Sequence, residues 1–320
     1  MKQKIQKEEL TVTDIFNRVI IKKKLMSILK NQKPDFIICT HPFIGELLEL
    51  EEISEYAKSP KGLNACILTV VTDYVVHPSW LNTASDYFIF ASDRLRYFLN
   101  EIKPELLAED KAKFLGIPIK SIFNEPFDKK LLKEKYGLYD SFTYLVMGGG
   151  YGIGSIKENV KLLIQSEIDN FVKSNIIVIC GNNEELYESI STIKKKLDKN
   201  NQIKILKFID YIDELMKLSD VIITKPGGIS ITEAMACKLP IVIREYLPGQ
   251  EERNTEFLLN NNLGILAQND LSFLSYINQL KEDEEYRTQI IENQSKIYNT
   301  DTLKNIYSLM KQEQRKKENI

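Results

Sequence analysis

A glycine-rich segment in the second half of the chain lies between a strand-like apolar run and a helical pattern. The apolar run is Val221–Ile223, and the segment after it is Lys225-Pro226-Gly227-Gly228. The order predicts a buried parallel strand, a glycine turn and the amino terminus of a helix. The unpaired N–H groups and positive dipole end of such a terminus bind anions, and glycines let a phosphate approach the backbone closely.

The predicted helix carries three polar side chains near its start, Ser230, Thr232 and Glu233. We expect Ser230 to open the helix and Glu233 to lie in its first turn, where a carboxylate can accept two hydrogen bonds from a ribose diol. With the glycine turn, these groups predict a site for the diphosphate and ribose of a nucleotide. The alternative is an ordinary strand-to-helix turn with a first-turn carboxylate, because glycines recur in such turns.

Two further loops leave the carboxyl ends of predicted strands, where open α/β sheets bind ligands. Leu247–Asn254 follows the strand Ile241–Arg244, and a second glycine-rich loop follows the strand Thr143–Met147. The N–H groups of that glycine loop could face a diphosphate from the side opposite Lys225–Gly228. The alternative is a glycine turn that binds nothing. The residues expected to bind from this loop are Gly148, Gly149, Gly150, Tyr151 and Gly152.

The first half of the chain contains one cluster of reactive side chains, Asp73, His77 and Trp80. Asp73 follows a strand-like run, where an ionised carboxylate is costly unless it is exposed or paired. We expect Asp73 and His77 to orient an acceptor or relay a proton, with Trp80 beside them. The alternative is a loop histidine with satisfied hydrogen bonds and a tryptophan that only packs. His41 precedes a proline and a helical pattern, so a structural role at the helix start is equally consistent with the sequence.

Composition and charge exclude several classes of protein. The chain has 320 residues and a net charge of −2, so bulk binding to nucleic acid is not expected. No apolar run approaches the roughly 20 residues of a membrane span, and no signal-peptide pattern is visible. The four cysteines have no CxxC spacing and are expected to be buried free thiols in a reducing compartment. Two histidines without a carboxylate cluster predict no metal site.

Strand-like runs alternate with helical patterns along the chain, which predicts an α/β fold with parallel sheets. The length predicts two domains, with the break in the stretch 116–140. The expected strands are Phe36–Thr40, Cys66–Thr72, Tyr87–Ala91, Lys113–Leu115, Thr143–Met147, Ile176–Cys180, Ile203–Leu206, Val221–Thr224, Ile241–Arg244 and Gly264–Leu266. The expected helices include Phe43–Ala57, Asp93–Ile102, Leu131–Tyr136, Ile156–Val172, Glu184–Leu197, Ile212–Leu218, Ile229–Ala236, Gln250–Asn260 and Leu303–Lys317.

The expected divisions of the chain are 1–122, 123–298 and 299–320, the last being a charged helix with a basic end. Before the first strand, Asp14–Asn31 forms a basic amphipathic pattern. Such a helix can lie on an anionic membrane, or its apolar face can pack on the sheet while its lysines stay in solvent. The first domain has only about four predicted strands, and we expect it to be short by at least one βαβ unit.

Seven elements spread over nearly the whole chain resemble the monogalactosyl- and glucosyl-diacylglycerol synthases, relatives of the enzyme that adds N-acetylglucosamine to lipid I. These elements are Pro34–Pro42, Val71–Trp80, Leu115–Ile119, Met147–Gly154, Cys180–Asn183, Thr224–Ala236 and Pro248–Glu251. The resemblance implies the GT-B arrangement of two facing Rossmann-like domains. The C-terminal domain of such an enzyme holds a UDP-sugar, and the N-terminal domain holds a lipid acceptor.

The sequence departs from this family at its start. Family members begin with a strand and a Gly-Gly-Gly-His loop, whose histidine is a candidate base, and this sequence contains no such loop. We therefore expect an incomplete N-terminal domain, and weak or absent activity without a complementing N-terminal segment.

The resemblance also implies roles for individual residues in the UDP-sugar site. Glu233 would contact the ribose, while Gln250 and Glu251 would contact the sugar hydroxyls, with Asn254 grouped among the substrate-binding residues. The alternative for Gln250 and Glu251 is a polar pair at a helix start. The walls around uracil are expected from Gly181, Asn182, Phe208 and Ile209, although an aromatic after a strand, such as Phe208, can simply pack.

The sequence thus predicts an inverting hexosyltransferase that moves glucose or galactose from a UDP-sugar to diacylglycerol without a metal or other cofactor. We expect a cytoplasmic protein bound peripherally to an anionic membrane, at the inner face of the cell membrane. One alternative is transfer from UDP-GlcNAc to a polyprenyl-diphosphate lipid, or an epimerase of the same build. Another is a UDP-sugar-binding subunit that is inactive until a second chain completes it. The Asp73, His77 and Trp80 pattern favours diacylglycerol, and the missing glycine loop favours the subunit.

Overall fold

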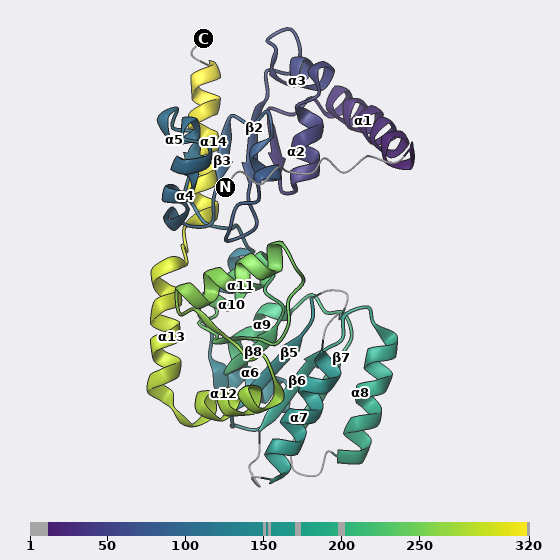
Figure 1. Cartoon of the computed structure of the whole chain (residues 1–320), viewed down its shortest axis with the longest axis vertical. Helices are drawn as coiled ribbons and strands as arrows, with labels where there is room; N and C mark the ends of the chain where they lie inside the picture. The colour runs from purple at the N-terminus through teal and green to yellow at the C-terminus, as the bar shows by residue number, and fades with distance from the viewer. Residues whose placement is uncertain (1–11, 150–151, 153–154, 170–173, 198–201, 319–320) are drawn as a thin grey trace.

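The computed structural model describes residues 12–149, 152, 155–169, 174–197 and 202–318. Within these ranges the chain forms two α/β domains, one above the other along the long axis of the molecule (Figure 1). The N-terminal sheet has the order β1-β2-β3-β4, and the C-terminal sheet has the order β10-β9-β8-β5-β6-β7. All the strand pairs are parallel, which confirms the α/β fold expected from the alternating pattern.

The N-terminal sheet is built from short strands, which lie close to their predicted positions. They are β1 (Phe36–Cys39), β2 (Cys66–Val70), β3 (Tyr87–Ile89) and β4 (Ala112–Lys113). The helices around this sheet are α1 (Val12–Gln32), α2 (Pro42–Leu48), α3 (Glu51–Lys58), α4 (Arg96–Ile102) and α5 (Glu105–Ala108), with 3₁₀ turns η1 (Pro78–Leu81), η2 (Asp93–Leu95) and η3 (Ser121–Asn124).

Two predicted helices of this domain are broken. The predicted helix Phe43–Ala57 is divided into α2 and α3 because Leu50 has an extended backbone, with φ −61° and ψ 126°. The predicted helix Asp93–Ile102 begins as the tighter turn η2, which Ser92 caps by accepting a hydrogen bond from the N–H of Arg94.

The C-terminal sheet buries both of its faces, as parallel sheets covered by helices do. Its strands are β5 (Thr143–Met147), β6 (Asn175–Ile179), β7 (Gln202–Leu206), β8 (Val221–Thr224), β9 (Ile241–Ile243) and β10 (Gly264–Leu266). Its helices are α6 (Lys129–Lys135), α7 (Ile156–Asp169), α8 (Glu184–Leu197), α9 (Ile212–Leu218), α10 (Gly228–Ala236), α11 (Gln250–Asn260), α12 (Asp270–Glu282) and α13 (Glu284–Ile297). Strand side chains alternate between two cores, so that Leu145 and Ile222 lie in one and Val146 and Ile223 in the other.

The strand order places a topological switch point between β5 and β8. From this pair, β6 and β7 continue in one direction and β9 and β10 in the other. A crevice for ligands forms at the carboxyl ends of the strands at such a point, because the following helices lie on opposite faces of the sheet. Here those helices are α7, which follows β5, and α10, which follows β8.

The last helix, α14 (Thr302–Glu318), returns to the N-terminal domain (Figure 1). Its Ile306 and Leu309 pack in one cluster with Cys66 and Leu68 of β2. Thr302 at its start donates a hydrogen bond to the carbonyl of Leu115. The end of the chain thus covers the first sheet.

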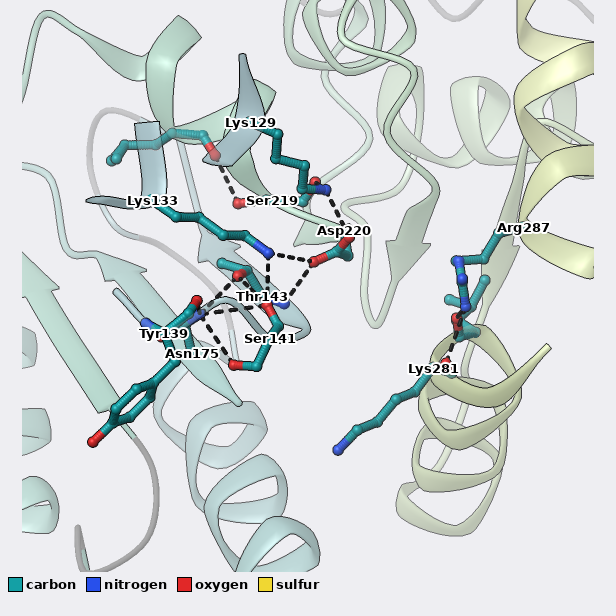
Figure 2. Close-up of polar contacts among 12 residues, drawn as sticks. Lys129, Lys133, Tyr139, Ser141, Thr143, Asn175, Ser219, Asp220, Lys281 and Arg287 are labelled. Carbon is teal, nitrogen blue, oxygen red and sulfur yellow. Dashed lines mark hydrogen bonds and ion pairs between the residues drawn. The ribbon is translucent and has the colours of Figure 1, made fainter. Parts of the chain in front are cut away.

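A partly buried ionic network fixes the amino ends of the C-terminal strands, and Figure 2 shows Lys129 and Lys133 converging on Asp220. Asp220 also accepts a hydrogen bond from the N–H of Thr143 at the start of β5, at 2.8 Å. Asn175 joins this region by donating to Thr143 Oγ1, at 3.0 Å. Because ligands bind at the carboxyl ends of such strands, we assign these charges to the fold.

The two domains meet where β2 ends and α10 begins. A Cβ atom added at Gly228 would lie 2.0 Å from the carbonyl oxygen of Thr72 and 3.2 Å from Cα of Asp73. The next residue, Tyr74, is buried in the core of the C-terminal domain and stacks on Phe257 of α11, with ring centroids 4.9 Å apart. Glycine at position 228 is therefore required for domain contact.

We predict that Gly228→Ala destabilises the protein by about 1–3 kcal/mol, because the added methyl group forces backbone segments of two domains apart. Gly227→Ala is the matched control, since no described atom lies within 4 Å of its added Cβ and its φ of −71° suits alanine. Thermal unfolding measured by circular dichroism compares the two variants. Equal melting temperatures would contradict a close contact at Gly228.

Candidate functional site

A cavity of about 240 Å³ lies between the two domains, next to the contact at Gly228. One wall comes from segments that follow β1 and β2, and the other from the start of α10 and the start of α11. The residues that line the cavity are Thr40, His41, Pro42, Thr72, Asp73 and Trp80 on the N-terminal side and Gly227, Gly228, Ile229, Ser230 and Gln250 on the C-terminal side. Predicted residues from both halves of the chain therefore meet in one cavity.

The amino terminus of α10 is the most polar part of the C-terminal wall. Its N-cap residue, Gly227, has no side chain, so within the described chain no side chain caps the N–H groups of the first turn. These groups carry the positive end of the helix dipole and lie at the cavity. The helix begins at Gly228, before the predicted Ser230, because Gly227 already ends the extended backbone.

Glu233 therefore lies in the second turn of α10, and its predicted place in the first turn is wrong. Burial raises the pKa of its carboxyl group to about 7, Lys120 opposes that shift, and Asp213 adds to it. The side chain thus lies near the linker between the domains and the start of α9. A half-buried carboxyl group at this place stays partly protonated at neutral pH.

Asp73 is the carboxylate of the cavity, as the sequence suggested. Burial raises the pKa of Asp73, while the Asn254 amide, the Trp80 indole and the nearby His77 oppose that shift. Asn254 Nδ2 donates to Asp73 Oδ1 at 3.0 Å. The Nε1–H of the buried Trp80 lies near enough to Asp73 to oppose the rise of its pKa, although it makes no hydrogen bond with any described residue. Asp73 is therefore a partly buried carboxylate held by a hydrogen bond from a neutral donor, Asn254.

The two histidines occupy different places. His77 is exposed, caps η1 by accepting a hydrogen bond from the N–H of Ser79, and is not part of the cavity wall. His41 caps α2 through Nδ1, which accepts from the N–H of Phe43 at 3.2 Å, and it does line the cavity. The sequence analysis did not include His41 among the predicted site residues. His41 follows the carboxyl end of β1, just as Asp73 follows the carboxyl end of β2.

Asn254 and Thr232, both expected to bind substrate, are buried and join the domains. Asn254 accepts from the N–H of Tyr74 at 2.9 Å and donates to Asp73 and to the carbonyl of Pro226, each at 3.0 Å. The hydroxyl of Tyr74 donates to Thr232 Oγ1 at 2.8 Å, because Thr232 donates its own proton to the carbonyl of Gly228. Asn254 thus couples the conformation of Asp73 to the position of α10.

The glycine loop after β5 is only partly described, and Gly150 and Tyr151 lie outside the described residues. Gly149 and Gly152 have positive φ angles, and Gly152 packs so closely on the carbonyl of Cys180 that no side chain would fit. Where α7 begins, Glu245 accepts from the N–H and the hydroxyl of Ser155, at 2.7 and 2.6 Å.

A small space of about 20 Å³ lies at the switch point, beside this contact. It lies at the ends of β5, β8 and β9, and Lys225, Arg244 and Glu245 are among its lining residues. Predicted Lys225 thus belongs to the switch point, and Gly148 lies directly after β5 on the same edge.

The other predicted contact residues lie around this edge. Gln250 lines the cavity, whereas Glu251 accepts from the N–H of Leu247 at 2.7 Å and so closes its own loop. Phe208 is 62% exposed after β7, while its neighbour Ile209 packs against the core. Gly181, with φ +59°, and the exposed Asn182 follow β6. Phe208 is therefore free to stack on a flat ring.

Two further features concern metals and membranes. Among the described residues, no group of three or more histidine, cysteine, aspartate or glutamate side chains is placed to hold a metal ion. Of the helices that the structure describes, none combines the length and the apolar character needed to cross a bilayer.

Two family models match the chain, that of the monogalactosyldiacylglycerol (MGDG) synthases over residues 2–119 and that of the group 1 glycosyl transferases over residues 151–297. A processive diacylglycerol beta-glucosyltransferase of Bacillus licheniformis is 32% identical over 272 residues, which cover 85% of this chain and 67% of the relative. The same-named protein of Bacillus pumilus is 30% identical over 279 residues, with coverages of 86% and 68%.

Solved structures of low sequence identity share the fold. Acinetobacter baumannii MurG has a TM-score of 0.64 at 15% identity, with 93% of this chain and 79% of MurG covered. UDP-bound Staphylococcus aureus MnaA has a TM-score of 0.65 at 16% identity, with 95% and 82% covered. These likenesses confirm the GT-B fold that the sequence predicted.

We predict that Asn254→Ala lowers the free energy of unfolding by about 2–4 kcal/mol, because three hydrogen bonds of about 1 kcal/mol each are lost and buried backbone groups are left unpaired. Asn261→Ala is the control at the C-cap of the same helix, since the Asn261 side chain donates to the carbonyl of Phe257 one turn away, within its own domain. Urea unfolding measures both. If Asn254→Ala lowers the free energy of unfolding no more than the control does, the hydrogen bonds of Asn254 do not stabilise the contact between the domains.

Proposed function

The chain belongs to the glycosyltransferase family of the monogalactosyldiacylglycerol synthases and diacylglycerol glucosyltransferases, and on this premise we propose that it transfers glucose from UDP-glucose to diacylglycerol. Membership supports a UDP-sugar as donor and diacylglycerol as acceptor. The choice of glucose over galactose is supported by the names of the two Bacillus relatives.

The observation that carries this proposal is the pairing of Asp73 with the uncapped start of α10 across one cavity. Glycosyl transfer needs a base for the acceptor hydroxyl on one side and stabilisation of the departing diphosphate on the other. Asp73 supplies the first, and the N–H groups of α10 supply the second. The sugar would lie between them, beside Gln250.

In this mechanism, Asp73 takes the proton of the diacylglycerol hydroxyl as its oxygen attacks the anomeric carbon. The bond between that carbon and the diphosphate oxygen breaks, and its electron pair leaves with UDP. The burial that raises the pKa of Asp73 makes it a stronger base while it is ionised. Attack from the side opposite the leaving group inverts the anomeric centre.

The rival enzyme function, transfer to a polyprenyl diphosphate, fits the cavity less well. This reaction would bring a second diphosphate into the cavity beside that of the donor, and the described residues that line the cavity include no lysine or arginine to offset the added charge. The N-terminal wall instead presents Asp73, which repels an anion. A neutral diacylglycerol has no such conflict.

We place the protein at the inner face of the cell membrane, where a cytoplasmic nucleotide sugar meets a membrane lipid. Helix α1 supports this placement, because its Ile20 and Ile28 are each 48% exposed and lie near the exposed Lys23 and Lys24. Its Leu29, by contrast, is buried against α2 and α3. The helix thus packs on the domain with one face and leaves apolar and basic side chains outside.

The second candidate function is a UDP-sugar-binding subunit that a second chain completes. It is favoured by β1, which is an edge strand among the described strands. Its Ile38 is 47% exposed, and its outer side could pair with another parallel strand. This candidate predicts that the chain binds UDP-glucose but transfers no glucose to diacylglycerol vesicles unless a complementing segment is added.

We predict that Asp73→Asn lowers glucose transfer to diacylglycerol vesicles by about 10²–10⁴-fold, the contribution of a general base, while UDP affinity stays unchanged. Sugar transfer to the vesicles is measured with radiolabelled UDP-glucose and UDP-galactose as donors. Asp93→Asn is the control, because Asp93 is exposed after β3, outside the cavity wall. Transfer by Asp73→Asn at the parental rate would overturn the assignment of the base.

The same variant should be at least as stable as the parent at pH 8. Because the pKa of Asp73 is raised in the folded protein, its ionisation disfavours folding above that pKa, and neutral asparagine avoids this cost. The difference should shrink as the pH falls and the parental carboxyl group becomes protonated.

We predict that UDP-glucose binds more tightly as the pH rises from 6 to 8, because a ribose diol donates to the ionised form of Glu233, whose pKa burial raises to about 7. Below that pKa the affinity should fall by up to about tenfold per pH unit. Calorimetry with UDP-glucose avoids phosphate titration in this range. Glu233→Gln should bind more weakly, with no such slope, and a slope retained in this variant would place its origin elsewhere.

A further inference from the structure

His41 has a defined protonation pattern because it caps α2. Its Nδ1 accepts a hydrogen bond from the N–H of Phe43, at 3.2 Å. A ring nitrogen that accepts a hydrogen bond carries the lone pair, so the single proton of the neutral imidazole is on Nε2. The cap therefore makes Nε2–H the free donor of this side chain.

His41, which carries this donor, lines the cavity between the domains. His41 lies on the N-terminal wall, and the opposite wall contains Gly228, Ile229 and Ser230, whose N–H groups form the uncapped start of α10. On the N-terminal wall the only other side chain with an N–H group is Trp80, whose indole faces Asp73. Of the two described N–H side chains of this wall, His41 is thus the one that is not among the groups that shift the pKa of Asp73.

We propose that the Nε2–H of His41 donates a hydrogen bond across the cavity to the diphosphate of the sugar donor, and so stabilises the leaving group. This inference rests on the proposed function. When the bond between the anomeric carbon and the diphosphate oxygen breaks, the electron pair moves onto the diphosphate. The N–H groups of α10 and Nε2–H of His41 then face that charge from opposite walls.

The same geometry assigns the base to Asp73 and excludes His41 from that role. A histidine base needs a lone pair on the nitrogen that faces the acceptor hydroxyl. His41 could provide one at Nε2 only by placing its proton on Nδ1, which would break the hydrogen bond from Phe43 and uncap α2. The proton of the acceptor therefore goes to Asp73, and His41 keeps its own.

Two amide substitutions at position 41 test the two roles of the side chain independently, the helix cap at Nδ1 and the hydrogen-bond donor at Nε2. His41→Asn keeps an acceptor near the position of Nδ1, and asparagine is a preferred N-cap residue, but it removes Nε2. His41→Gln can place an amide N–H near the position of Nε2, but it loses the cap. Thermal unfolding, UDP and uridine affinities by calorimetry, and glucose transfer to diacylglycerol vesicles are measured for both variants and the parent.

We expect His41→Asn to melt near the parental temperature and to bind uridine with the parental affinity. It should bind UDP at least fivefold more weakly. Its kcat should be lower by about 10²–10³-fold, as expected for the loss of a hydrogen-bond donor to the developing negative charge. His41→Gln should melt at a lower temperature but recover part of the UDP affinity and turnover. Parental UDP affinity and turnover in His41→Asn would overturn the inference, as would losses in both variants that follow their melting temperatures.

The parent protein distinguishes this inference from the proposed function. If the parent binds UDP but transfers no glucose, the comparison of UDP with uridine in His41→Asn still decides the role of His41. If the parent does not bind UDP, the proposed function and this inference both fail.

Discussion

The close approach of α10 to the end of β2 is the constraint on which the rest of the site depends. At Gly228 there is no space for a side chain between the helix and the carbonyl of Thr72, so backbone meets backbone across the two domains. Tyr74 then enters the core of the C-terminal domain, and Asn254 ties Asp73 to Pro226. Asp73 from one domain is therefore positioned by side chains of the other, and any separation of the domains would disturb its orientation.

The electrostatic character of the cavity follows from this contact. Because the walls are close, Asp73 loses water, and the resulting rise of its pKa is opposed first by two neutral groups, the Asn254 amide and the Trp80 indole, and last by the nearby His77. A cation in their place would stabilise the carboxylate and lower its basicity. On the other wall the charge is only that of the helix dipole, which attracts a diphosphate without a metal ion. The proposed proton acceptor, Asp73, and the proposed anion-binding helix start thus lie on opposite walls of the cavity.

Much of the fold was predictable from the sequence, because each strand is a short apolar run and each connection carries its own turn residues. The helix breaks were less predictable, since the extended backbone of Leu50 divides α2 from α3 where the apolar pattern continues. In the site, Asp73 and the turn at Gly227 were proposed from their places at strand ends, and both line the cavity. The interdomain roles of Gly228 and Asn254 could not be found, because residues 72–74 and 254 are far apart in the sequence and meet only through the packing of two domains. The same is true of His41, whose place at the cavity depends on how β1 and α10 are brought together.

The two helices at the switch point differ in a way that decides where an anion can bind. At α7, the carboxylate of Glu245 already occupies the N–H and hydroxyl groups of Ser155. At α10, the N-cap residue is glycine, and no described side chain takes the corresponding place. To bind at Ser155, a diphosphate would have to displace the Glu245 carboxylate, and it would be repelled by the negative charge of that carboxylate. Among the described residues, no side chain competes for the donors at the start of α10. This difference supports our proposal that the diphosphate binds at the wall that faces Asp73 and His41.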